Sequence, residues 1–306
     1  TLCAAGVRPR VLVRDPAKPR WIEGVEAEWI VGSLEDRESL RRLVDGAGTV
    51  MHLAGVLRAG RESGFDAGNR LGTANLVEAV SKVAPKARLV HVSSLAAVGP
   101  SAEPEGRAPG DLPAPISAYG RSKLGGEGEV AALGDSGWWC ILRPPGVYGP
   151  RDTDIFEFFK MASKGLAGIP AGERWLTLAY VADVVRAILA AAAVGVHRGI
   201  YHLGEASPQL LDDVFHQLAE AGGCRVRVIR VPSAIISAAG AMGSVLQRVG
   251  WRRLPLTLDK TKELLARHWT AQTTVSHEAL GLGTGTLFAH GAETSWQWYR
   301  LMGWVR

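Results

Sequence analysis

The sequence of 306 residues is poor in cysteine and has no clustered metal ligands. Its cysteines, Cys3, Cys140 and Cys224, are odd in number and far apart, so neither a disulfide framework nor a metal-binding spacing is present. The eight histidines are scattered as well. We therefore expect no metal site, and a reducing compartment, the cytoplasm.

Strong charge of either sign and long apolar runs are also lacking. The net charge is +5 and no block of Lys or Arg stands out, which speaks against nucleic-acid binding and suits a small-molecule substrate or an anionic cofactor. The uncharged stretch of residues 231–246 is shorter than the ~20 residues that span a bilayer. We expect a buried or lid helix there, with a membrane-surface contact or an apolar substrate wall as the alternative.

Short β-rich runs alternate with helical patterns through the first half of the chain. The predicted strands are residues 10–14, 27–31, 49–55, 88–94 and 138–143, and the predicted helices are residues 33–44, capped by Ser33, 69–83 and 118–133. This alternation predicts an α/β fold with a Rossmann-type, doubly wound parallel sheet. Such a sheet binds its ligand at the carboxyl ends of its strands.

The pattern changes after Pro150. Helices are predicted at residues 155–162 and 181–193, and strands at 199–203 and 225–231. We expect a Rossmann domain of residues 1–149 and 179–204, and a smaller, discontinuous substrate domain of residues 150–178 and 205–306. The chain starts with a helical turn ended by Gly6, without Met or an initial strand, so we expect a fragment.

Tyr119 and Lys123 are the pair whose spacing points to chemistry. Four residues apart on a helix, they lie on one face, one turn from each other. A phenol titrates near pH ~10, and a fixed cation beside it lowers that pKa. The pair is therefore a candidate proton donor and acceptor. Alone the pattern is weak, because any helix can carry a surface Tyr and Lys at this spacing.

Six motifs in order give the pair a context. They are residues 52–55 (HLAG), 69–73 (NRLGT), 93–99 (SSLAAVG), 119–123 (YGRSK), 142–150 (LRPPGVYGP) and 180–183 (YVAD). In this order and spacing the chain resembles the extended short-chain dehydrogenase/reductase superfamily, the NAD(P)-dependent epimerases, dehydratases and reductases. It is most similar to the branch of dihydroflavonol reductases and 3β-hydroxysteroid dehydrogenases.

The resemblance implies a catalytic set of three residues. Tyr119 would exchange a proton with the substrate oxygen, Ser94 would hold that oxygen, and Lys123 would lower the pKa of Tyr119 and bind the nicotinamide ribose. The backbone lining the cofactor would be that of Ala54, Gly55, Pro145 and Gly146. The family's first strand and glycine-rich phosphate loop match nothing here, and we expect them to precede Thr1.

The cofactor that the resemblance implies is NADP, with NAD as the alternative. Arg14 follows the predicted strand near the place where NAD-preferring members carry an acidic residue, and a guanidinium there suits a 2′-phosphate. Lys18 would assist. Ser33 stands where an adenine-contacting Asp is common in the family, so the resemblance does not supply that contact.

Two departures from nucleotide-sugar epimerases bear on the substrate. Gly146 replaces their Asn, and Leu176 replaces the Arg that grips the diphosphate, although Arg174 would lie on the same strand face and could substitute. Phe156 and Trp175 stand among apolar residues that form either domain core or a substrate wall. We predict an oxidoreductase acting on an alcohol or ketone of a hydrophobic small molecule. A nucleotide-sugar epimerase is the first alternative, a non-catalytic NAD(P)-binding scaffold or sensor the second, and a homodimer stays open.

Overall fold

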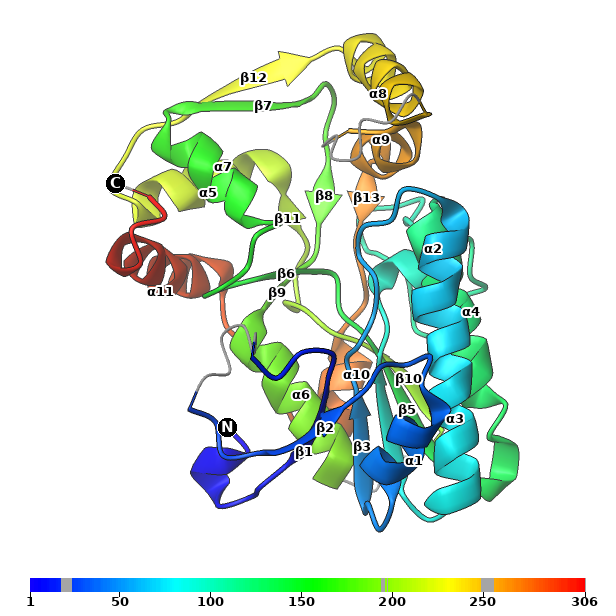
Figure 1. The fold of residues 1–306 in the computed structure, drawn as a ribbon. Helices are drawn as coiled ribbons and strands as arrows, with labels where there is room; N and C mark the ends of the chain where they lie inside the picture. The colour runs from blue at the N-terminus through cyan, green and yellow to red at the C-terminus, as the bar shows by residue number, and fades with distance from the viewer. Residues whose placement is uncertain (18–23, 194–195, 197, 249–255, 306) are drawn as a thin grey trace.

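The computed structural model describes residues 1–17, 24–193, 196, 198–248 and 256–305 (Figure 1). A four-stranded sheet in the order β10-β5-β4-β3 forms the centre of its first part, here called the sheet lobe. The strands are β3 (Thr49–His52), β4 (Arg88–Val92), β5 (Trp138–Arg143) and β10 (Gly199–His202). All neighbours pair in parallel, which confirms the predicted α/β fold with a Rossmann-type sheet.

Two further parallel strands precede this sheet. β1 (Arg10–Val13) pairs with β2 (Glu28–Val31) as a separate sheet. Within the described residues, neither strand is hydrogen-bonded to β3. Leu12 nevertheless packs on the same core cluster as Val50 of β3, so the pair lies on the β3 side of the sheet lobe.

Helices α1 (Arg37–Val44), α3 (Gly72–Val83) and α4 (Ala118–Ala131) cover one face of the sheet. Their apolar positions recur at helical spacing and meet the strands in one buried cluster that includes Leu40, Leu76, Val80, Leu89 and Val130. This burial is the main force that holds α4 against the sheet.

Two helix starts differ from the sequence-based expectation. Asp36, not Ser33, caps α1, because its carboxylate accepts the N–H groups of Glu38 and Ser39, whereas the Ser33 hydroxyl accepts only from Glu35. The predicted helix 69–83 becomes α-helical only at Gly72, because α2 (Glu62–Asp66) is followed by a π-helical turn (Ala67–Leu71) that includes its first residues. That turn places a buried Asn69 at the start of α3.

Helix α6 (Val181–Ala193) covers the opposite face and packs on Val90, Cys140 and Leu142. Helix α10 (Thr274–Leu280) lies beside α6, and its Leu280 joins the same cluster. The predicted division into residues 1–149 with 179–204 and the remainder stays a prediction, and α10 is a part of the remainder that packs on the sheet lobe.

The second lobe, at the top of Figure 1, has its own core. Phe159, Phe215, Trp296 and Tyr299 fill it. The elements around it are α5 (Phe156–Ser163), β7 (Leu166–Pro170), α7 (Leu211–Ala221), β12 (Arg227–Val231) and α11 (Phe288–Leu301). β7 and β12 pair in parallel.

Short strands and a helix pair complete the second lobe. β6 (Gly146–Tyr148) pairs with β9 (Leu178–Tyr180), and β8 (Trp175–Leu176) lies between β11 (Gln209–Leu210) and β13 (His268–Trp269). Helices α8 (Ser233–Arg248) and α9 (Leu258–Leu265) pack on each other. Within the described ranges, none of the helices has the length and apolar character needed to cross a membrane.

Candidate active site

Helix α4 is fixed at its first turn by two caps. The Ser117 hydroxyl accepts from Gly120 N at 3.0 Å. Both carboxylate oxygens of Asp259, on α9, accept from Ala118 N at 3.1 and 3.0 Å. A carboxylate at a helix N-terminus is stabilised by the free N–H groups and the helix dipole. Tyr119 therefore lies in a turn that is held from both lobes.

The structure brings Tyr119, Ser94 and Lys123 together at the carboxyl ends of β3 and β4. The side chains of Ser94 and Tyr119 are hydrogen-bonded to each other. Lys123 is 5% exposed, and its Nζ donates to the carbonyl oxygen of Val92 at 2.8 Å. A Cβ atom at Gly55 would lie 3.8 Å from that Nζ, so the ammonium faces the backbone after β3.

The acidity of Tyr119 differs from the prediction. Burial raises its pKa to about 12, the carboxylates of Glu263 and Asp154 add to the rise, and the hydrogen bond with Ser94 opposes it. The expected lowering by Lys123 is wrong for this arrangement, because removal of the phenol from water outweighs the favourable contacts. Tyr119 thus holds its proton at neutral pH and suits the role of a proton donor.

A buried ion pair supports Lys123 from the next turn of α4. Burial lowers the pKa of Lys123 to about 8, while the Glu127 carboxylate raises it. Glu127 accepts from Arg143 Nε at 2.9 Å, from Arg143 Nη2 at 2.6 Å and from the Ser93 hydroxyl at 2.5 Å. The Ser93 hydroxyl is therefore used in the contact between α4 and the sheet. The sequence analysis missed Glu127, although the spacing 119, 123, 127 places it on the same helix face.

Two buried histidines lie near Lys123. The rings of His52 and His91 are 4.9 Å apart, and His52 Nε2 is 2.8 Å from Thr73 Oγ1. Burial and the Lys123 charge lower the pKa of His52 to about 3, and burial holds that of His91 well below its usual value. Both rings are neutral at physiological pH, so Lys123 is the cation of this region.

Asn69 fixes the loop that follows Gly55. Its Oδ1 accepts from Val56 N at 2.6 Å, and its Nδ2 donates to Val56 O at 3.0 Å and to Ser122 Oγ at 2.9 Å. A Cβ atom at Gly55 would lie 2.9 Å from Asn69 Oδ1, so a side chain there would have to displace the amide. The absence of a side chain at Gly55, which is exposed, thus leaves room for the Asn69 amide to hold this loop.

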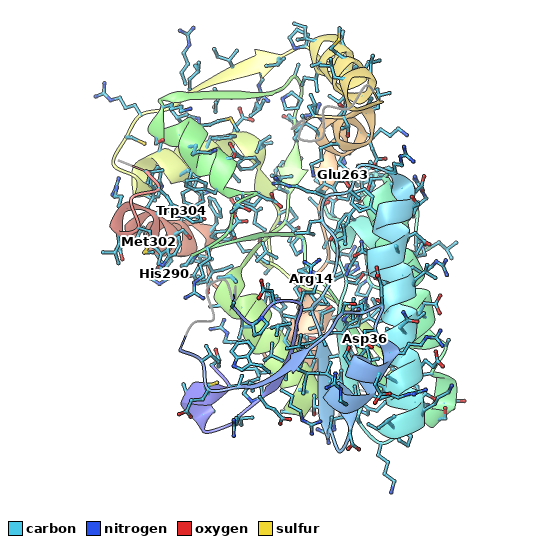
Figure 2. All side chains as sticks on the ribbon, viewed as in Figure 1. Arg14, Asp36, Glu263, His290, Met302 and Trp304 are labelled. Atoms are coloured by element: carbon cyan, nitrogen blue, oxygen red, sulfur yellow. The ribbon has the colours of Figure 1, made fainter. Side chains whose placement is uncertain are left out.

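The residues predicted to bind a cofactor fit a nicotinamide nucleotide. Arg14 is exposed at the end of β1, on the side of the sheet lobe that faces the second lobe (Figure 2). Ala54 and Gly55 are exposed shortly after β3, Pro145 is half-buried shortly after β5, and Gly146 is exposed at the start of β6. Buried Lys123 adds an ammonium with three donor positions. Lys18 lies outside the described residues.

The Arg174 guanidinium is not free to bind a diphosphate. Arg174 is 5% exposed, and its guanidinium donates to the carbonyl oxygens of Leu265 at 2.8 Å, Ala266 at 3.2 Å and Ala171 at 3.1 Å. Arg174 therefore ties β8 to the end of α9, and it is not free to take the place of the epimerase Arg at Leu176, the possibility that the sequence left open.

The apolar candidates for substrate contact have different surroundings. Phe156 is 9% exposed, with its ring centroid 4.6 Å from that of Tyr299 and 5.1 Å from that of Trp304, which places it in the core of the second lobe. Trp175 is half-buried in β8. A Cβ atom at Gly146 would lie 3.2 Å from side-chain carbons of Ile155 and Leu178, so an Asn there would require both to shift.

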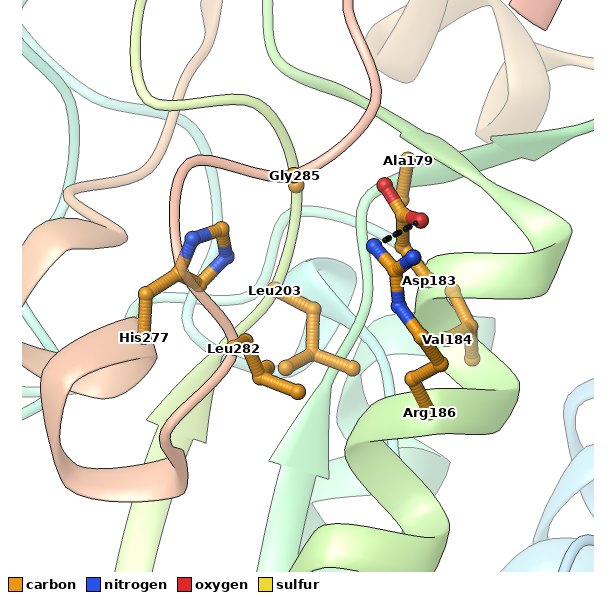
Figure 3. A pocket seen from close by; sticks show the side chains of 9 residues that line it. Ala179, Asp183, Val184, Arg186, Leu203, His277, Leu282 and Gly285 are labelled. Atoms are coloured by element: carbon orange, nitrogen blue, oxygen red, sulfur yellow. Dashed lines mark hydrogen bonds and ion pairs between the residues drawn. The ribbon is translucent and has the colours of Figure 1, made fainter.

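A small pocket beside α6 contains none of the predicted catalytic residues (Figure 3). Asp183 lies at its edge, where it binds Arg186 at 2.6 Å and accepts from Thr286 N at 2.6 Å and Thr286 Oγ1 at 2.9 Å. The motif residue Asp183 thus anchors the loop before α11. Across the described residues, no three His, Cys, Asp or Glu side chains are grouped as metal ligands.

Comparisons with known proteins identify the family of the chain. The model of the NAD dependent epimerase/dehydratase family matches residues 1–204. The chain is 31% identical over 310 residues to the ceramide reductase of Caulobacter vibrioides, covering 99% of this chain and 90% of that protein. It is 28% identical over 261 residues to 4-hydroxy-2-methyl-3-oxo-4-farnesyl-3,4-dihydroquinoline-1-oxide ketoreductase of Stigmatella aurantiaca, covering 83% and 76%. Its fold is similar to that of MoeE5 in complex with UDP-glucose and NAD, with a TM-score of 0.76, 23% identity and coverage of 98% and 93%.

Proposed function

Because the chain belongs to the NAD-dependent epimerase/dehydratase family, we propose that it is an NADP-dependent ketoreductase that converts a carbonyl of a hydrophobic small molecule to an alcohol. The observation that carries the proposal is a protonated Tyr119, hydrogen-bonded to Ser94 and one helical turn from buried Lys123. A group that keeps its proton at neutral pH suits donation to a carbonyl oxygen that gains charge.

The roles of the three side chains follow from their chemistry. Bound NADPH supplies the hydride. The hydroxyls of Ser94 and Tyr119 hold the carbonyl oxygen, and Tyr119 donates its proton to that oxygen as negative charge develops there. The buried Lys123 ammonium, one helical turn from Tyr119, has donor positions beyond its bond to Val92 O with which to hold the nicotinamide ribose of the bound cofactor.

The hydrophobic character of the proposed substrate is supported by the contacts of Arg174 and by the relatives. The carboxylates of Glu263 and Asp154 act on the pKa of Tyr119, but each is also paired with a cation, Lys260 and Arg58 respectively. Arg174 is engaged by backbone carbonyls and is not free to bind the diphosphate of a nucleotide sugar. The names of two relatives specify a ceramide and a farnesyl-bearing quinoline, both lipophilic.

NADP is proposed over NAD because of Arg14. Its exposed guanidinium follows β1, where the ribose 2′ position is expected in this fold, and it can form paired hydrogen bonds to a phosphate.

The test is a panel of ketones with increasing alkyl chain length, assayed by NADPH absorbance, beside UDP-glucose binding by calorimetry. We expect kcat/KM to rise with chain length and UDP-glucose to bind weakly. Tight UDP-glucose binding, with interconversion of sugar epimers, would favour the epimerase instead. NADPH binding without turnover of any ketone or UDP-sugar would favour the scaffold.

A further inference from the structure

Helix α8 presents three large apolar side chains to the outside of the second lobe. Ile235, Met242 and Val245 are 60%, 61% and 54% exposed. With Ala238 and Ala239 they fall on one face at helical spacing, here called the α8 apolar face. No Asp, Glu, Lys or Arg occurs in residues 231–247 of the sequence to interrupt this face.

The opposite face of α8 holds two glycines and Ile236, which is 8% exposed. A Cβ atom at Gly240 would lie 2.0 Å from Thr261 Oγ1, and one at Gly243 would lie 1.9 Å from Leu256 O. The helix therefore packs this face closely on α9 and the residues just before it, and turns three other large apolar residues outward. A surface helix in water normally has the reverse arrangement, and a contiguous exposed apolar face marks a contact site.

The charge around α8 is positive. Lys260 and Lys262 on α9 are exposed, and Arg230 is exposed just before α8, although Lys260 is paired with Glu263 at 2.8 Å and Arg230 with Asp212 at 2.7 Å. The acidic residues of α9 turn inward, since Asp259 binds the first N–H of α4 and the Glu263 side chain is 14% exposed. Along the sequence, residues 225–263 hold eight Lys and Arg against two Asp and Glu, a balance of +6, whereas the whole chain carries +5.

We propose that α8 docks on the surface of an anionic lipid bilayer. The α8 apolar face enters the boundary between headgroups and acyl chains, and the surrounding basic residues contact the anionic headgroups. A hydrophobic partner protein would use the apolar face but has no need of the positive rim, so the combination favours a membrane.

Helix α8 is connected to the catalytic helix α4 through α9. α8 rests on α9 through Gly240 and Gly243, and Asp259 of α9 caps α4 one residue before Tyr119. A bilayer in contact with α8 is consequently two helices away from the reacting hydroxyl. A lipophilic substrate would reach the site from the bilayer without crossing bulk water.

The test is flotation of the full chain with phosphatidylcholine vesicles, with and without phosphatidylglycerol. We expect binding to the vesicles with phosphatidylglycerol, weak binding to phosphatidylcholine alone, and weakening by salt because the headgroup contacts are screened. The variant Ile235→Glu/Met242→Glu should bind at least tenfold more weakly, since each large apolar side chain withdrawn from a lipid contact costs about that factor or more.

Leu301→Glu is the matched control. Leu301 is 82% exposed on α11, away from α8 (Figure 1), so this variant should bind like the unmodified chain. Thermal melting by circular dichroism checks that each variant is folded, and Val245→Glu gives the same test if the double variant unfolds.

Three results would overturn the inference: no binding of the unmodified chain to vesicles with phosphatidylglycerol, equal binding by the folded variant, or a dimer in sedimentation that Met242→Glu separates. Flotation requires no turnover. A chain that floats but reduces no ketone would refute the proposed function alone, and one that reduces ketones but does not float would refute the docking alone.

Discussion

Glu127→Gln removes the negative charge that two buried cations share. The Glu127 carboxylate receives both hydrogen bonds of the Arg143 guanidinium and one from Ser93, and it raises the pKa of Lys123 one turn earlier on α4. Arg143 is 1% exposed, so water cannot replace the lost partner. The substitution keeps the shape of the side chain and changes its charge.

The expected loss of stability is large. Removal of one partner of a buried ion pair leaves the other charge uncompensated and costs about 3–5 kcal/mol. With an unfolding entropy of roughly 2 cal/mol/K per residue, this lowers Tm by about 5–8 °C for a chain of this length.

The same substitution should move the pH profile. Lys123 has a pKa of about 8, already lowered by burial, and loss of the Glu127 charge lowers it further. The ammonium is then lost at a lower pH. The decline of ketone reduction on the alkaline side should therefore begin at lower pH in Glu127→Gln than in the unmodified enzyme.

Calorimetry gives the Tm, and NADPH oxidation across the alkaline range gives the profile. Glu129→Gln is the control on the same helix, because Glu129 forms a part-exposed pair with Arg70 at 3.2 Å, a type of pair that contributes about 0–1 kcal/mol. A Tm of Glu127→Gln equal to that of the control would refute the stability argument. If the alkaline decline of ketone reduction stays at the same pH or moves to a higher pH, the coupling of Glu127 to Lys123 is refuted.

Four further outcomes are expected. Tyr119→Phe should lower ketone reduction by about 10²–10⁴-fold with NADPH affinity retained in a fluorescence titration, and a fully active variant would exclude Tyr119 as the proton donor. Arg14→Ala should raise the Kd of NADPH by roughly ten- to a hundredfold, the value of a hydrogen bond to a charged group, while equal weakening of NADH would contradict the contact to the 2′-phosphate. Reduction by the unmodified enzyme should decline as pH rises through about 8, where Lys123 loses its proton, and a rate that is flat through this range argues against its charge in turnover. Asp259→Asn should cost about 0.5–2 kcal/mol in chemical denaturation and lower kcat more than NADPH affinity, and unchanged kcat would limit Asp259 to a structural role.

The strands of the sheet lobe and helix α4 could be predicted because local patterns determine them. Short runs of mostly apolar residues mark β4 and β5, and the predicted helix 118–133 starts at the first residue of α4. The meeting of Ser94 with Tyr119 follows from topology alone, since parallel strands end at one edge of a sheet.

The properties that sequence reasoning missed depend on contacts between distant segments. The raised pKa of Tyr119 comes from burial and from Glu263 and Asp154, which local spacing does not relate to it. Arg174 shares a strand face with Leu176, but whether it is free depends on carbonyl groups some ninety residues later. The outward orientation of the α8 apolar face likewise depends on the packing of Gly240 against Thr261, which is distant in the sequence.

The loop between β4 and α4 is joined to a much later part of the chain, and this bears on the order of folding. Ser101 pairs with His268, Arg107 N donates to Thr270 O at 3.0 Å, and Ala118 is capped by Asp259. During synthesis, β3 and β4 can pair early, whereas the first turn of the catalytic helix receives its second cap only after about 140 more residues have been added. Closure of such long loops is slow. The nascent protein should therefore acquire its sheet well before it acquires a competent active site.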